Sequence, residues 1–186
     1  MSSREAIIVP GGQFGPFAPL LMFCADAAER RDATVTPVSW NDRDHLLTLR
    51  PEEFGPWVLD QVERAVPSVR SAEPSNTLLI GKSLGTHAAT LTAELGLPAI
   101  WLTPVLTSDW VVSALRRSTA PFLLVGGTAD SLWNSALARE LTPYVLEVDD
   151  ADHGMYVPGP LAASTAVLGQ VATAAEEFLD AVLWRT

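Results

Sequence analysis

The segment Thr77-Leu78-Leu79-Ile80-Gly81-Lys82-Ser83-Leu84-Gly85 decides how the rest of the chain is interpreted. Residues 77–82 are a β-rich apolar run, and residues 84–95 follow at once with a helical pattern. The last five residues of the segment match Gly-x-Ser-x-Gly, which in a sharp strand-to-helix turn exposes a serine hydroxyl. The pattern is weak alone, but this position at the carboxyl end of a strand predicts that Ser83 is a nucleophile.

Similar runs alternate along the whole chain. Besides 77–82, β-rich runs cover residues 5–10, 33–40, 98–103, 121–126 and 143–148. Helical patterns cover residues 17–31, 51–66, 84–95, 108–117, 132–141 and 162–184. Six such alternations with short connections predict an α/β fold: one domain over residues 1–186, with helices on both faces of a mostly parallel six-stranded sheet. Pro37 places run 33–40 at a sheet edge, and only a short helix fits between 98–103 and 121–126, so no lid domain is expected there.

Composition narrows the class of protein. The 186 residues are 48% hydrophobic and 18% charged, as in a globular domain. The net charge of −10 argues against nucleic acid or an anionic membrane as a partner. The N-terminal residues lack a secretory signal and no apolar run is long enough to span a bilayer, so we expect a cytoplasmic protein. The single cysteine, Cys24, lies in an apolar helical stretch and is expected to be buried and unreactive.

A serine nucleophile needs a base, and the base needs an acid that orients it. Asp130 follows the fifth β-rich run and His153 follows the sixth, so both lie on loops at the same sheet end as Ser83. We predict that Ser83, Asp130 and His153 form a catalytic triad. Asp109 is the substitute acid if Asp130 only caps a helix, whereas Asp152 is too close to His153 in sequence to face it.

Backbone amides for an oxyanion hole are expected at two places. The first is the N–H of Leu84, which follows the nucleophile. The second is the loop Pro10-Gly11-Gly12-Gln13-Phe14-Gly15, where the N–H of Gln13 is favoured and that of Gly12 is next. An apolar substrate pocket is predicted from large side chains near the strand ends, namely Phe14, Trp40, Trp101, Trp133 and Met155.

The remaining histidines have a structural interpretation beside a functional one. His87, four residues after Ser83, either touches the site or is a packed, hydrogen-bonded histidine. His45, with Asp42 and Asp44, is more typical of a solvated turn than of a metal site. We therefore expect no metal and no organic cofactor.

With these features the chain resembles the α/β-hydrolase superfamily over nearly its whole length. It is similar to a short, lidless member that lacks the superfamily's first two antiparallel strands. The resemblance implies the triad and the loop amides named above, whereas Lys82 departs from the histidine that is frequent before the nucleophile. The predicted function is hydrolysis of a small-molecule carboxylic ester or thioester through an acyl-serine. Acyl transfer, lyase or cyclase chemistry on the same triad, and a non-catalytic binding role, stay as alternatives. The substrate's identity and the oligomeric state stay open.

Overall fold

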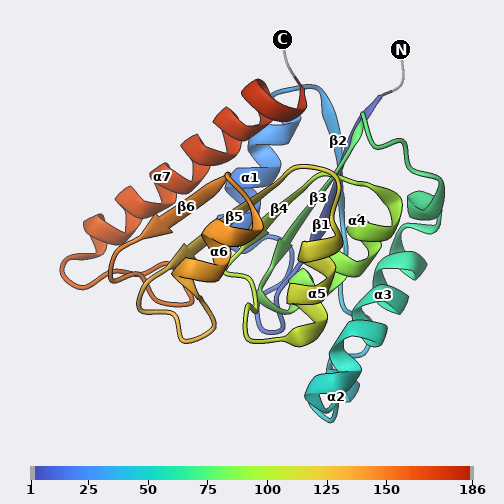
Figure 1. The fold of residues 1–186 in the computed structure, drawn as a ribbon, viewed down its shortest axis with the longest axis horizontal. Helices are drawn as coiled ribbons and strands as arrows, with labels where there is room; N and C mark the ends of the chain where they lie inside the picture. Colours follow the sequence, from blue (N-terminus) through green and yellow to red (C-terminus); the bar gives the residue numbers. More distant parts are fainter. Residues whose placement is uncertain (1–2, 185–186) are drawn as a thin grey trace.

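The computed structural model describes residues 3–184, which form a single sheet covered by helices on both faces (Figure 1). The strands are β1 (Arg4–Val9), β2 (Ala33–Pro37), β3 (Thr77–Lys82), β4 (Ala99–Leu102), β5 (Phe122–Gly127) and β6 (Val145–Val148). The helices are α1 (Pro19–Glu29), α2 (Arg43–Leu46), α3 (Phe54–Ala65), α4 (Ala89–Leu95), α5 (Asp109–Arg117), α6 (Ser135–Leu141) and α7 (Leu161–Phe178). Short 3₁₀ segments cover Pro51–Glu53, Pro67–Ser71 and Ser83–Ala88, and a π-helical turn covers Leu179–Leu183.

The strands are ordered β2-β1-β3-β4-β5-β6, and every neighbouring pair is parallel. The predicted α/β architecture and the edge position of the Pro37 strand are therefore confirmed, and the sheet is wholly rather than mostly parallel. The strand order reverses between β1 and β3, where open α/β sheets form a crevice beyond the carboxyl ends of the strands. The loop that follows β1 and the turn that follows β3 both lie at this crevice.

Successive strand residues point to opposite faces and thereby make two cores. Ile7, Leu79 and Leu124 pack under α3, α4, α5 and α6. Ile8, Ile80 and Val125 pack under α1 and α7, and Figure 1 shows these two helices together on one side of the sheet. Cys24 of α1 is fully buried as predicted, and burial raises the pKa of its thiol to about 12.

The predicted helix over 84–95 differs in form from the observed one. Its first part, Ser83–Ala88, is a 3₁₀ segment, and α-helix begins only at Ala89. Two side chains form hydrogen bonds with backbone carbonyls in this segment. Thr86 Oγ1 donates to the Ser83 carbonyl at 2.7 Å, and His87 Nδ1 lies 2.9 Å from the Leu84 carbonyl oxygen. Such bonds compete with the backbone hydrogen bonds of an α-helix.

Two further segments are helical where no helix is predicted, although a solvated turn is predicted around His45. α2 is a single turn in which the Asp42 carboxylate accepts from the His45 N–H at 2.9 Å, so these residues form a capped turn. The segment with α2 lies at the lower tip of the molecule (Figure 1). The Pro67–Ser71 segment is the other addition. None of the helices within residues 3–184 has the length and apolarity that crossing a bilayer requires.

Candidate active site

Ser83 occupies a strained turn between β3 and the helix that follows. Its φ of 51° is in the left-handed region, which is uncommon for a residue with a side chain. The two glycines of the pattern make the turn possible. A Cβ on Gly81 would lie 2.5 Å from the Trp101 ring, and one on Gly85 would lie 2.3 Å from the Val9 carbonyl oxygen. The helix can therefore approach β1 closely, with the Ser83 side chain directed into the cleft that it lines.

We predict that Gly85→Ala lowers the free energy of unfolding by about 1–3 kcal/mol, because its Cβ would meet rigid backbone. Denaturant unfolding followed by circular dichroism measures this change. The matched control is Gly169→Ala in α7, where an added Cβ meets nothing within 4 Å. That substitution should leave stability unchanged or raise it by up to about 1 kcal/mol. Equal stability of the two variants would contradict the close approach described here.

The side chains of Ser83, His153 and Asp130 form a continuous hydrogen-bonded chain. His153 Nε2 lies 2.8 Å from Ser83 Oγ, and His153 Nδ1 lies 2.7 Å from Asp130 Oδ2. The Asp130 side chain is 1% exposed and that of His153 is 38% exposed. The second Asp130 oxygen accepts from the Leu132 N–H at 2.9 Å, which holds the carboxylate in place.

Contacts between the loops after β5 and β6 bring Asp130 and His153 together. The Ala129 N–H donates to the Ala151 carbonyl at 3.1 Å, and the Asp150 N–H donates to Thr128 Oγ1 at 2.8 Å. A Cβ on Gly127 would lie 2.2 Å from the Ala151 carbonyl oxygen, so only glycine allows this approach. The two loops thus form one packed unit at the end of the sheet.

Asp152, which precedes His153 directly, fixes the turn that carries His153. Its Oδ1 accepts from the N–H groups of Gly154 at 2.7 Å and Tyr156 at 2.9 Å. Asp109, the substitute acid, is an exposed residue at the start of α5 and lines the cleft. Asp130 is therefore the carboxylate that His153 contacts.

Lys82 contacts both Thr103 and the loop that carries His153, a role that no sequence pattern indicates. Lys82 Nζ donates to Thr103 Oγ1 at 3.1 Å and to the His153 carbonyl at 3.3 Å. Burial lowers the pKa of Lys82, while the nearby charges of Asp130 and Asp152 act in the opposite direction. Thr103 follows β4 and has a φ of 42°, a costly conformation for a β-branched residue. A residue before proline favours extended backbone, so no sequence pattern could have predicted this geometry.

The glycine-containing loop after β1 lies beside Ser83. A Cβ on Gly11 would be 3.5 Å from Ser83 Cβ, and one on Gly12 would be 3.7 Å from a Leu84 methyl group. Two side chains hold the outer side of this loop. Trp40 Nε1 donates to the Gly11 carbonyl at 2.9 Å. Arg43 donates to the Gln13 carbonyl at 2.9 Å and to that of Gly12 at 3.4 Å.

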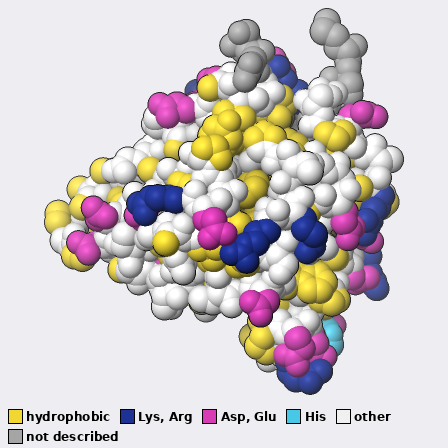
Figure 2. Space-filling model, in the orientation of Figure 1, with side chains coloured by type: hydrophobic (Ala, Val, Ile, Leu, Met, Phe, Trp, Pro, Cys, Tyr) yellow, Lys and Arg dark blue, Asp and Glu magenta, His cyan; other side chains and the backbone are white. Residues whose placement is uncertain are grey.

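A cleft of about 1560 Å³ opens around Ser83. Its polar end is formed by the loop that carries Asp152, His153 and Tyr156. The remaining walls are mainly apolar and include Leu46, Leu49, Phe54, Leu84, Val105 and Trp110. On the face seen in Figure 2, charged side chains of both signs are interspersed rather than gathered into a patch of one sign.

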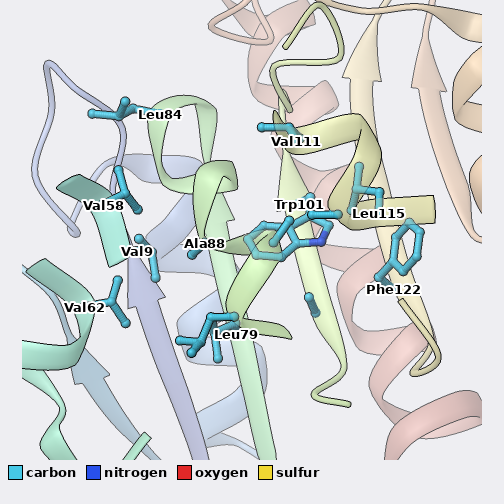
Figure 3. Close-up of a cluster of buried hydrophobic side chains, with 14 of the residues drawn as sticks. Val9, Val58, Val62, Leu79, Leu84, Ala88, Trp101, Val111, Leu115 and Phe122 are labelled. Atoms are coloured by element: carbon cyan, nitrogen blue, oxygen red, sulfur yellow. The ribbon is translucent and has the colours of Figure 1, made fainter. Parts of the chain in front are cut away.

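The predicted pocket of large side chains is largely wrong. Phe14 lines the cleft and is 70% exposed. Trp101 is completely buried, and Figure 3 shows it packed near Leu115 and Phe122 in the core. It points inward because Gly81, without a side chain, leaves room for its ring.

The other three residues also lie outside the cleft walls. Trp133 packs over Gly126, where an added Cβ would lie 2.1 Å from the Trp133 ring. Trp133 Nε1 donates a hydrogen bond to the Glu147 carboxylate at 2.6 Å. Met155 is 3% exposed in the core beneath α1 and α7. Trp40 lines a separate cavity of about 210 Å³ behind the glycine-containing loop. Proximity to a strand end did not distinguish core side chains from cleft side chains.

Residues 3–184 contain no group of three or more His, Cys, Asp or Glu side chains arranged to hold a metal ion.

No protein-family model matches the sequence, and comparison with curated proteins also finds no match. Solved structures do resemble it. A protein from Xanthomonas campestris pv. campestris assigned to the α/β-hydrolase superfamily is 23% identical, with 96% of this chain and 99% of that chain covered and a TM-score of 0.70. Dienelactone hydrolase from Anabaena variabilis is 18% identical, with 98% and 88% covered and a TM-score of 0.70.

A third similar structure, from Xanthomonas campestris, is described as an α/β serine hydrolase without a lid. It is 16% identical, with 98% of this chain and 83% of that chain covered and a TM-score of 0.65. At such identities the likeness concerns the fold and leaves the reaction open. The chain therefore has the fold of the α/β-hydrolase superfamily, and the connection between β4 and β5 holds only the short helix α5.

Proposed function

We propose that this protein is a serine hydrolase that cleaves a carboxylic ester or thioester through an acyl-Ser83 intermediate. The observation that carries the proposal is the hydrogen-bonded chain from Ser83 Oγ through His153 to Asp130, at 2.8 and 2.7 Å. Three side chains from three separate loops meet in the order that nucleophilic acyl transfer requires. The hydrolase descriptions of the similar structures support the same reaction class.

In the proposed reaction His153 Nε2 removes the proton as Ser83 Oγ bonds to the substrate carbonyl carbon. The Asp130 carboxylate accepts from Nδ1–H, so Nε2 is left free to act as the base, and Asp130 then stabilises the imidazolium. His153 returns the proton to the leaving oxygen or sulfur as its bond to carbon breaks. Water, activated by His153, then attacks the acyl-enzyme and releases the free acid and Ser83.

The backbone N–H of Leu84 and an amide of the glycine-containing loop are the proposed oxyanion donors. In a planar trans peptide the N–H points opposite to the carbonyl. Trp40 binds the Gly11 carbonyl from the small cavity, so the Gly12 N–H points away from Trp40. Arg43 binds the Gly12 carbonyl, which belongs to the same peptide group as the Gln13 N–H, so that N–H points away from Arg43. Gly12 and Gln13 both line the main cleft, which supports either amide as the second donor.

Hydrolysis is favoured over acyl transfer by the exposure of the base. The His153 side chain is 38% exposed in a cleft of about 1560 Å³, so water can reach it. An acyltransferase must instead keep water from the acyl-enzyme. The intact hydrogen bonds among the three side chains also speak against a purely binding role.

A product assay tests the proposal. Purified protein should hydrolyse p-nitrophenyl butyrate or a matching thioester with saturation kinetics, and release one free acid per alcohol or thiol. Acyl product formed on an added acceptor, without free acid, would favour transfer. Absence of turnover, together with failure of a fluorophosphonate to label the folded protein, would refute a catalytic role.

A further inference from the structure

His87 is a buried histidine on the cleft wall that the proposed mechanism does not use. It is 3% exposed and lies one turn beyond Ser83, in the 3₁₀ segment that follows the nucleophile. Ser83 and His87 both line the same cleft. A substrate attached at Ser83 could therefore reach the His87 ring.

The hydrogen bonds of His87 define which ring nitrogen is free. Nδ1 lies 2.9 Å from the Leu84 carbonyl oxygen, and since a carbonyl only accepts, Nδ1 carries a proton and donates it. Burial lowers the pKa of His87, which favours the neutral ring. In a neutral imidazole whose Nδ1 is protonated, Nε2 is a hydrogen-bond acceptor.

Nε2 has no protein donor. Within residues 3–184, the contacts of His87 are the Nδ1 bond to Leu84, a bond from Trp110 Nε1 to its backbone carbonyl at 3.2 Å, and an edge-on ring contact with Phe54. In that range, the side-chain nitrogens that are both fully buried and without a partner belong to Trp101 and Trp184. His87 Nε2 has no partner either but is not fully buried, so it is accessible from the cleft that His87 lines. Nε2 is therefore an acceptor that a hydrogen-bond donor entering the cleft can bind.

Two aromatic side chains, Phe54 and Trp110, flank His87. The Phe54 and His87 ring centroids are 5.8 Å apart, with the rings inclined at 73°. Trp110 lies over Gly55, where an added Cβ would be 2.2 Å from its ring, so α3 and α5 meet closely at this wall. Flat side chains of this kind pack well against an aromatic group.

We propose that His87 selects esters whose aromatic acyl group carries a hydroxyl, because Nε2 accepts a hydrogen bond from that O–H. The inference rests on the proposed function and names the substrate class of the same site. His153 must protonate the leaving group, so the leaving group lies on the side of the His153 loop. The acyl group then extends toward His87, Phe54 and Trp110. The hydroxyl supplies the missing donor, while the aromatic ring fills the apolar wall.

Four p-nitrophenyl esters test the proposal with the intact protein: those of phenylacetic, 3-hydroxyphenylacetic, 4-hydroxyphenylacetic and 4-methoxyphenylacetic acid. The methoxy ester keeps an oxygen at the ring position of the 4-hydroxy ester but donates no hydrogen bond. We expect kcat/KM for at least one hydroxy isomer to exceed those of the unsubstituted and methoxy esters by about 10-fold. His87→Leu should reduce this ratio to within about 2-fold, and His87→Gln, which keeps an acceptor, should retain part of it.

Each outcome decides the proposal. It is overturned if wild-type protein prefers neither hydroxy isomer, or if His87→Leu keeps the preference. Circular dichroism and thermal unfolding report whether each variant folds. If His87→Leu does not fold, the hydroxy-to-methoxy ratios of wild type and His87→Gln decide.

A binding measurement separates failure of the inference from failure of the proposed reaction. Calorimetry on Ser83→Ala compares the Kd of 4-hydroxybenzyl methyl ketone, its 3-hydroxy isomer and benzyl methyl ketone, none of which needs to react. Tighter binding of a hydroxy ketone by about 10-fold supports the role of His87 even without turnover. Equal binding of the three ketones overturns it, whether or not the wild-type protein hydrolyses esters.

Discussion

Ser83→Ala is expected to lower kcat for a p-nitrophenyl ester by about 10⁶-fold, because the acyl-enzyme can no longer form. His153 and Asp130 keep their own 2.7 Å contact in this variant, and the cleft keeps its shape. Alanine tolerates the left-handed φ of 51° about as well as serine does, so Tm should be little changed. Initial rates with purified variants, together with thermal unfolding, measure both quantities.

The matched control is Ser68→Ala, which makes the same chemical change at an exposed position in the Pro67–Ser71 segment. Its kcat and KM should equal those of the wild-type protein within error. If Ser83→Ala retained even a tenth of the wild-type turnover while Ser68→Ala was unchanged, Ser83 would not be the nucleophile.

Asp130→Asn should lower kcat by about 10⁴-fold with little change in the position of the side chain. In the wild-type protein Asp130 Oδ1 accepts a hydrogen bond from the Leu132 N–H at 2.9 Å, and the asparagine side-chain oxygen can still accept this bond. The amide group would then donate to His153 Nδ1, which places the proton on Nε2 and removes the base that Ser83 needs. The pH dependence of kcat and the thermal stability of the variant complete the measurement.

Asp109→Asn provides the control for this second substitution, because Asp109 is also a carboxylate on the cleft wall. It is exposed and does not contact His153, so we expect less than a 10-fold change in kcat. A larger loss in Asp109→Asn than in Asp130→Asn would identify Asp109 as the acid instead.

The strand pattern and the position of Ser83 could be predicted because local signals determine them. The apolar run before Gly81 is typical of a strand buried on both faces, and Pro37 favours an edge position for its strand. The carboxyl ends of parallel strands lie along the same edge of the sheet. The direction of the strands alone therefore predicts that the loops carrying Asp130 and His153 lie near Ser83. The 2.7 and 2.8 Å distances among these side chains fit that expectation.

The walls of the cleft could not be predicted, because they depend on contacts between distant segments. Trp101 turns into the core since Gly81 leaves space for it, and nothing in the sequence near Trp101 shows this. Leu46 and Leu49 reach the cleft through a turn that has no periodic pattern. The Lys82 contact with the His153 carbonyl joins residues that are 71 positions apart.

Mass spectrometry of the protein mixed rapidly with an ester and quenched in acid is the most direct test of the central claim. We predict a mass increase equal to one acyl group, which peptide mapping locates on Ser83 and which is absent from Ser83→Ala. The adduct should accumulate further in His153→Ala supplied with a highly activated ester, because deacylation needs the same base. An acyl group mapped to another residue, or turnover without any adduct on Ser83, would contradict the account.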